Sequence, residues 1–273
     1  MSSLEIIKLI SAGAGIGFFI GMTGVGGGVL VLPVLTRFFG IETTAAVGTG
    51  SLYAFLTKIL AGIAHFKLKT IDYRTAGYFL LASIPVTILS AWYISSRSGD
   101  NKQFQENLSF WIAWVIIGCG VMMIWNFYKR FISKGKEDEA ETTDDKSELP
   151  ETKSRGHFIV GLLLAMTVGG IVGATSITGS LLLPLMIVFF RLPIKKAVGT
   201  TILIAGVLAM VTAAVYAIFS PGKNVLWQMA IIMSIGSIAG VWLGSKLTVK
   251  LPSKPLRAVV IIIVFVAGIS MMK

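Results

Sequence analysis

Cysteine and histidine are nearly absent from this chain. Cys119 is the one cysteine among 273 residues, and His65 and His157 are the two histidines. One thiol excludes a disulfide within the chain and a cysteine-based metal site, and two isolated histidines cannot form an H-E-x-x-H zinc motif. The G-x-S-x-G turn of serine hydrolases and the G-x-x-x-x-G-K-[ST] phosphate loop are missing as well. We therefore predict a protein that is not an enzyme, has no cofactor or metal, and does not use ATP directly.

Charged residues are also scarce. They make up 14% of the chain and hydrophobic residues 55%, whereas soluble domains usually carry about 25% charged residues. Several apolar runs approach or exceed the ~18 residues of a transmembrane helix. We predict an all-α polytopic membrane protein whose partner is the lipid bilayer. The net charge of +11 lies mostly between the runs, which is typical of membrane orientation, so we expect no nucleic-acid partner.

The apolar runs form two sets of five, separated by a polar stretch. They lie near 4–22, 26–40, 44–66, 73–95 and 107–128, and near 157–176, 177–190, 195–219, 225–246 and 255–272. About ten helical segments are predicted, and the second segment of each set should be short or broken. We divide the chain into an N-terminal membrane repeat (1–132), a charged cytoplasmic linker (133–156) and a C-terminal membrane repeat (157–273). The linker holds eight of the thirteen acidic residues, which favours a solvated connector over a regulatory segment.

The two sets of runs look like copies of one another. With a shift of 151 residues, Pro33 falls on Pro184 and the AVGT block at 46–49 falls on the AVGT block at 197–200. Without a gap, 12 of the 27 positions from 28 to 54 are identical. Five crossings in each copy would place the second copy upside down. The sequence thus predicts two inverted repeats, a common plan of secondary transporters.

Charge counting supports ten crossings. If all ten runs cross, 17 lysines and arginines lie on one side and 6 on the other. If the two short runs only dip into the membrane, the split is 13 to 10. The positive-inside rule prefers the steeper bias, with the linker in the cytoplasm and both termini outside. The first run contains Glu5 and Lys8 and leads into a glycine motif, so we do not interpret it as a cleavable signal peptide.

The stretch GMTGVGGGVLVLP (21–33) places five glycines inside a hydrophobic region. A broken helix exposes backbone N–H groups and a helix N-terminus, which together suit an anion. Tight helix packing and a kink at Pro33 are the alternatives. The motif recurs as TSITGSLLLP (175–184), which offers four hydroxyl side chains where the first copy offers mostly glycine. The predicted substrate-binding residues in the two motifs are Thr23, Gly24, Gly26, Gly27, Gly28, Thr175, Ser176, Thr178, Gly179 and Ser180.

Lys58 lies near the middle of an apolar run that contains no Asp or Glu. An intramembrane charge costs at least about 2.5 kcal/mol even on the lenient insertion scale. Lys58 is therefore predicted to face a bound anion, unless it snorkels to an interface. Ser51, Lys58 and His65 are spaced by seven and share one helical stripe. His65 is a candidate for proton coupling, with a hydrogen-bonded interfacial histidine as the alternative. Thr49 and Thr200 of the two AVGT blocks complete the predicted substrate-binding set.

At these residues the sequence resembles the sulfite exporter TauE/SafE family, also described as the toluenesulfonate uptake permease group. The resemblance rests on GMTGVGGGVLVLPVL (21–35), on the stretch from AVGT through Asp72, and on GSIAGVWLGSKLTVKLPSKPLR (236–257). It implies a bundle of two related halves in the cytoplasmic membrane of a prokaryote that moves small sulfur-containing anions. The glycine motif, Lys58 and His65 match family positions. The SITGS segment departs from the repeated glycine pattern, which leaves the symmetry of the site and the substrate open.

We therefore predict a secondary transporter for a small sulfur-containing anion such as sulfite, thiosulfate or a sulfonate. An anion channel and a non-transporting membrane scaffold or sensor are the alternatives. The stripe of Gly236, Gly240 and Gly244 is expected to pack within the bundle rather than between protomers. The sequence leaves the direction of transport, the coupling ion and the oligomeric state unassigned.

Overall fold

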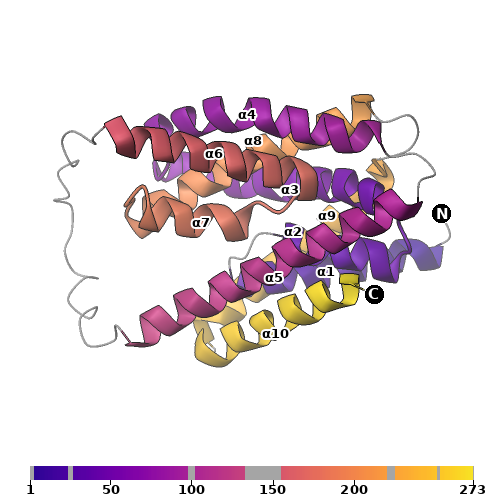
Figure 1. Ribbon diagram of the computed structural model, residues 1–273. Helices are drawn as coiled ribbons and strands as arrows, with labels where there is room; N and C mark the ends of the chain where they lie inside the picture. Colours follow the sequence, from indigo (N-terminus) through magenta and orange to yellow (C-terminus); the bar gives the residue numbers. More distant parts are fainter. Residues whose placement is uncertain are drawn as a thin grey trace.

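The computed structural model describes residues 3–23, 27–97, 102–132, 155–219, 225–250 and 253–272. In these residues the chain forms ten α-helices and one π-helical turn, with no strand (Figure 1). The elements are α1 (Ser3–Thr23), α2 (Gly28–Pro33), η1 (Val34–Phe38), α3 (Thr43–Lys67), α4 (Tyr73–Ser96), α5 (Lys102–Ile132), α6 (Arg155–Thr175), α7 (Gly179–Val188), α8 (Ile194–Phe219), α9 (Trp227–Lys250) and α10 (Ser253–Met272). The predicted all-α architecture is confirmed.

Six of the described helices are long and apolar enough to cross a membrane. The candidate spans are Ser3–Met22, Thr43–Lys67, Tyr73–Ser96, Lys102–Met122, Ile194–Phe219 and Trp227–Leu247. The second segment of each half is short, as predicted: α2 with η1 covers Gly28–Phe38, and α7 has 10 residues. At 1.5 Å per residue such a segment is about 15 Å long, roughly half of the ~30 Å hydrocarbon core.

Successive helices alternate in direction along the bundle (Figure 1). The N-terminus and the C-terminus lie at one end, whereas the end of α5 and the start of α6 lie at the other. We call these the terminal end and the linker end. Because each half contains an odd number of segments, α6 begins at the end opposite to that where α1 begins. The second half is thus inverted relative to the first.

The halves also exchange their packing partners. Helix α1 packs along α9, the fourth helix of the second half, and α6 packs along α4, the fourth helix of the first half. Helices α3 and α8 cross at the centre. The backbone repeats as well: Gly40 and Arg191, matched by the shift of 151, have φ angles of 63° and 52°. Shared backbone conformation at matched positions supports the duplication that the sequence predicts.

Small residues bring α1 and α9 into backbone contact. A Cβ built on Gly13 would lie 2.8 Å from Met233 Cα, and one built on Gly240 would lie 2.8 Å from the Phe18 nitrogen. Gly17 and Gly21 on α1, and Gly236 and Gly244 on α9, are equally crowded. The glycine stripe of α9 therefore packs inside the bundle against α1. Close approach of this kind is how membrane helices gain van der Waals contact where lipid supplies no hydrophobic driving force.

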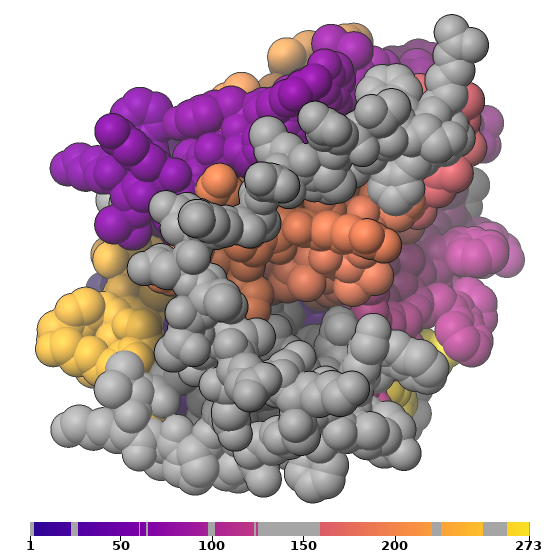
Figure 2. Space-filling model, turned by 90° about the vertical axis from the view of Figure 1, so that its left-hand side faces the viewer, coloured from indigo at the N-terminus to yellow at the C-terminus, as the bar shows by residue number. Residues whose placement is uncertain are grey.

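Exposed cations gather at the linker end, where α3 ends, α4 begins, and α7 meets α8. Figure 2 looks onto this end and shows purple residues of α3 and α4 next to orange residues of α7 and α8. The exposed cations here are Lys67, Lys69, Arg74, Arg191, Lys195, Lys196 and Lys246. Among the described cations, Lys8, Arg37, Arg97 and Lys102 are exposed at the terminal end. This distribution follows the charge bias counted along the sequence.

Candidate substrate site at the two helix breaks

The interruptions of the two halves touch each other. A Cβ built on Gly28, the first residue of α2, would collide with the Ser176 carbonyl oxygen and lie 3.1 Å from Ile177 Cα. Every residue of α2 is buried, so protein surrounds this short helix, as irregular backbone at membrane depth requires. A Cβ on Gly27 would lie 3.2 Å from the ring of Tyr53, whose hydroxyl donates to Ser237 Oγ at 2.8 Å. The two motifs singled out in the sequence therefore meet in space.

Part of the first motif is not placed. Gly24 and Gly26 lie outside the described residues, and Thr23 is the last residue of α1, with its side chain outside the description. The first break can therefore be followed from Gly27 onward. Tyr53 and the backbone of Ile177 border this junction and were not among the predicted residues. Tyr53 lies four residues after Thr49 on the same helix. This spacing places Tyr53 near the predicted residue Thr49 and was the sequence signal that could have indicated it.

The second break holds two buried hydroxyl groups without a partner. Ser176 has a φ of 59°, in the left-handed region, and its Oγ makes no hydrogen bond. Thr178 precedes α7 at the N-cap position, yet its side chain caps nothing and its Oγ1 is also unpartnered. A buried polar group without a partner costs about 1–3 kcal/mol. These hydroxyls are therefore free to donate to something that enters the junction.

The other hydroxyls of this motif are engaged. Thr175 Oγ1 donates to the Ile171 carbonyl at 2.7 Å and accepts from the Ile177 nitrogen at 3.3 Å. Ser180 Oγ lies 3.2 Å from Cys119 Sγ and donates to it. At the start of α7, the N–H groups of Gly179 and Ser180 have no acceptor within their own helix, whereas those of Leu181 and Leu182 donate to the Thr178 carbonyl. The N-terminus of α7 thus adds backbone donors and a positive dipole end to the unpartnered hydroxyls.

Lys58 lies at the crossing of α3 and α8. Its Cβ would be 3.7 Å from a Cβ built on Gly206 of α8, and the residue is half-buried. The shift of 151 matches Lys58 to Ala209, which is three residues from Gly206 on α8. Lys58 thus lies near its own counterpart in the other half, and therefore close to the axis that relates the halves. Among the described residues it has no hydrogen bond or ion pair. A Cβ built on Gly50 would lie 3.9 Å from Ser176 Oγ, and Gly50 is eight residues before Lys58, or about 12 Å along the helix.

The other two members of the seven-residue stripe have local partners. Ser51 Oγ donates to the Val47 carbonyl at 2.8 Å, one turn back in the same helix. His65 Nδ1 lies 2.8 Å from Thr70 Oγ1 in the connection between α3 and α4. His65 is thus half-buried at the linker end and hydrogen-bonded, far from the junction of the breaks along α3.

Thr49 and Thr200 each accept a hydrogen bond from the backbone just before a helix of the opposite half. Thr49 Oγ1 on α3 accepts from the Leu226 nitrogen at 3.0 Å, just before α9 begins. Thr200 Oγ1 on α8 accepts from the Asp72 nitrogen at 2.9 Å, just before α4 begins. The shift of 151 matches the two threonines, each donor nitrogen comes just before the fourth helix of the other half, and the bonds lie at opposite ends of the bundle. We call them the threonine latches. Sequence reasoning placed both residues in the substrate site and did not find this pairing.

An all-α bundle of inverted halves, joined at buried helix breaks, has the architecture of a multi-pass membrane transporter. The chain belongs to the sulfite exporter TauE/SafE family, whose model matches residues 9–271. The family resemblance inferred from the glycine motif is therefore confirmed, and the chain is a membrane transporter.

Curated relatives align over nearly the whole chain. The probable membrane transporter protein YjnA of Bacillus subtilis (strain 168) is 28% identical over 266 residues, which cover 97% of this chain and 99% of that protein. The probable membrane transporter protein YunE of the same organism is 29% identical, with 89% and 85% covered. The probable membrane transporter protein MJ0441 of Methanocaldococcus jannaschii is 25% identical, with 94% and 93% covered. No solved structure matches the chain.

Proposed function

We propose that this transporter is a secondary carrier for a small sulfur-containing anion such as sulfite, thiosulfate or a sulfonate. The name of the family supports a sulfur oxyanion as the substrate. The chain carries no phosphate loop in its sequence, which supports coupling to a gradient rather than to ATP. The proposed location is the cytoplasmic membrane of a prokaryote, with both termini outside and the linker in the cytoplasm.

The anion binds where the two helix breaks meet. The observation that carries this proposal is the contact of Gly28 with Ser176 and Ile177, beside two buried hydroxyls that have no partner. Ser176 and Thr178 donate their hydroxyl hydrogens to the anion, and the first N–H groups of α7 add to them. Because Gly28 has no side chain, the two breaks come into backbone contact, and the donors of the second break lie next to the first.

Lys58 supplies the positive charge on the path. Its ammonium group has no carboxylate partner in the described residues, and an unpaired charge in a membrane protein marks an ion pathway. Because Lys58 is about 12 Å beyond Gly50 along α3, it receives the anion as the anion leaves the junction toward the linker end. His65 is proposed as a proton carrier at that end, where its ring is already hydrogen-bonded to Thr70.

Alternating access arises from rocking of one half against the other. The threonine latches support this movement, because each joins the two halves and the pair lies at opposite ends. Release of the Thr49 latch opens the terminal end, and release of the Thr200 latch opens the linker end. The anion at the junction then meets one side of the membrane at a time.

Flux of labelled sulfite and thiosulfate in proteoliposomes tests the proposal. Ser176→Ala combined with Thr178→Ala should lower flux at least about 10-fold, because two charge-assisted hydrogen bonds are lost. Thr167→Ala is the matched control, since Thr167 is exposed and bonds back to its own helix. Flux that survives the double substitution would contradict the site. Currents that neither saturate nor show counterflow would indicate a channel instead.

A further inference from the structure

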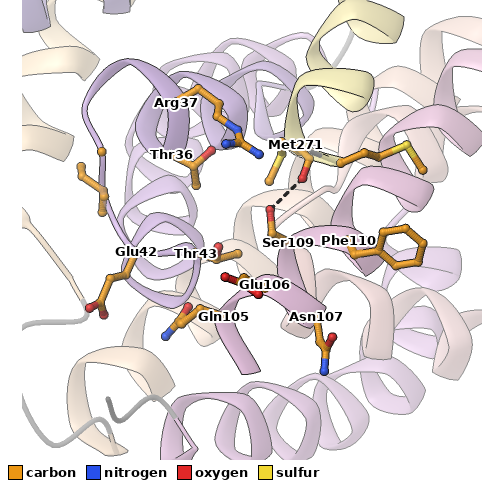
Figure 3. A pocket seen from close by; sticks show the side chains of 13 residues that line it. Thr36, Arg37, Glu42, Thr43, Gln105, Glu106, Asn107, Ser109, Phe110 and Met271 are labelled. Atoms are coloured by element: carbon orange, nitrogen blue, oxygen red, sulfur yellow. Dashed lines mark hydrogen bonds between the residues drawn. The ribbon is translucent and has the colours of Figure 1, made fainter. Parts of the chain in front are cut away.

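A pocket of about 520 Å³ opens at the terminal end of the bundle, away from the helix breaks (Figure 3). It lies between the turn from η1 to α3, the first turns of α5 and the last residues of α10. Its volume is within the range of about 300–1,000 Å³ that is usual for small-molecule sites. None of its lining residues was predicted to bind substrate, and none belongs to the two breaks.

Hydrogen bonds between elements hold the walls of the pocket. Gln105 of α5 makes two bonds to Thr44 of α3: its Oε1 accepts from the Thr44 nitrogen at 3.1 Å, and its Nε2 donates to Thr44 Oγ1 at 2.9 Å. Ser109 Oγ, on the same helix, donates to the Met271 carbonyl of α10 at 3.1 Å. The cavity is thus built from three fixed elements rather than from loose side chains.

The pocket carries opposite charges on opposite walls. Arg37 comes from η1 and Glu106 from α5, and Figure 3 shows both directed into the cavity while Glu42 points outward. In the described residues Arg37 and Glu106 form no ion pair with one another or with any other group. Thr36, Asn107 and Ser109 add uncharged polar groups between them. Separated charges that face one space can recognise the two ends of a single molecule.

The second half of the chain does not repeat this feature. At the positions that the shift of 151 matches to Thr36, Arg37 and Glu42, it has Ile187, Val188 and Pro193. The polar groups therefore break the internal symmetry at one end only. The polar lining of this pocket is therefore not among the features, such as the threonine latches, that the duplication repeats.

We infer that this pocket binds a small zwitterion, with the acid group of the ligand on the Arg37 guanidinium and its ammonium group on the Glu106 carboxylate. A simple anion would meet the negative charge of Glu106, and a simple cation would meet the positive charge of Arg37. A zwitterion satisfies both walls. The planar guanidinium suits the bidentate binding of an acid group. The inference stands independently of the proposed substrate at the helix breaks.

Calorimetric titration of the full-length protein in lipid nanodiscs tests the inference. The probes are the zwitterions β-alanine and 5-aminopentanoate, with propionate and propylamine as ligands that keep one charge each. At least one zwitterion should bind at least about 10-fold more tightly than either single-charge ligand. Arg37→Gln and Glu106→Gln should each weaken that binding about 10- to 100-fold, the usual effect of losing a charged hydrogen bond. Arg74→Gln, an exposed arginine at the linker end, should bind as the unmodified protein does.

Several results would overturn the inference. They are equal binding of propionate or propylamine, no measurable binding of either zwitterion, or unchanged binding in both pocket variants. The double variant at Ser176 and Thr178 separates the two proposals, because it should keep zwitterion binding while it loses anion flux. Loss of zwitterion binding in that variant would place the ligand at the helix breaks and would also overturn the inference.

Discussion

Adding one methyl group at Gly28 is the sharpest perturbation that the junction of the breaks offers. In Gly28→Ala the new Cβ would collide with the Ser176 carbonyl, closer than the 3.0 Å that real Cβ atoms respect. Backbone atoms cannot swing aside as a flexible side chain would. The two breaks must therefore separate by something on the order of 1 Å, because the backbone contact between Gly28 and Ser176 leaves no room for a methyl group at that point.

We expect this separation to impair transport more than folding. Overpacking of a tight interior usually costs about 1–3 kcal/mol, whereas a displacement of about 1 Å at a working site can lower a rate about 100-fold. We expect Gly28→Ala to insert and fold, with transport at least about 10-fold lower. The lost contacts are those between Gly28 and the segment Ser176–Ile177, which bring the donors of both halves together.

Sulfite and thiosulfate flux in proteoliposomes measures the effect, and thermal unfolding in detergent measures stability. Gly77→Ala is the matched control: a Cβ there meets nothing within 4 Å, and alanine stabilises a helix by up to about 1 kcal/mol relative to glycine. The control should therefore transport normally. Normal flux in Gly28→Ala would refute the reasoning, because the breaks would then not need to touch for the protein to work.

Further changes test the lysine, the latches and the helix packing. Lys58→Ala should lower flux at least about 10-fold while the unfolding temperature stays constant or rises, because an unpaired intramembrane charge is removed; a fall in both would indicate a structural role. Thr49→Val and Thr200→Val should each destabilise the fold by about 1–3 kcal/mol, since a backbone N–H loses its acceptor, whereas serine at either position should restore stability in thermal unfolding. Gly240→Ala should destabilise the fold by about 1–3 kcal/mol, because the added methyl group clashes with α1. Gly118→Ala is the control, since a methyl group there meets open space. Equal unfolding temperatures of the two variants would contradict this packing.

Much of the fold follows from one-dimensional patterns. Apolar runs of membrane length define the helices, because backbone polar groups in lipid must be satisfied within each segment. The duplication is visible because Pro33, Pro184 and the AVGT blocks align in one register. Charges in the connections indicate which ends lie on the same side. Each of these properties belongs to a residue and its near neighbours, so it can be read without knowing what packs against what.

The candidate site could be predicted only in part. The glycine motif and its hydroxyl-bearing copy were singled out, and the structure brings Gly28 and Ser176 together. It also separates hydroxyls that look equivalent along the chain: Thr175 bonds back to its own helix, whereas Thr178 has no partner. A hydroxyl can satisfy itself on the preceding turn or remain available, and the local sequence does not decide between the two.

By itself the sequence determined the class of the molecule: an all-α membrane transporter of the TauE/SafE family, built from two related halves. Only the tertiary structure decided which groups meet. It pairs Thr49 with Leu226 and Thr200 with Asp72, and it sets Arg37 opposite Glu106 across one pocket. The physical reason is that hydropathy and motif spacing are local, whereas these contacts join residues far apart along the chain and depend on how complete helices pack.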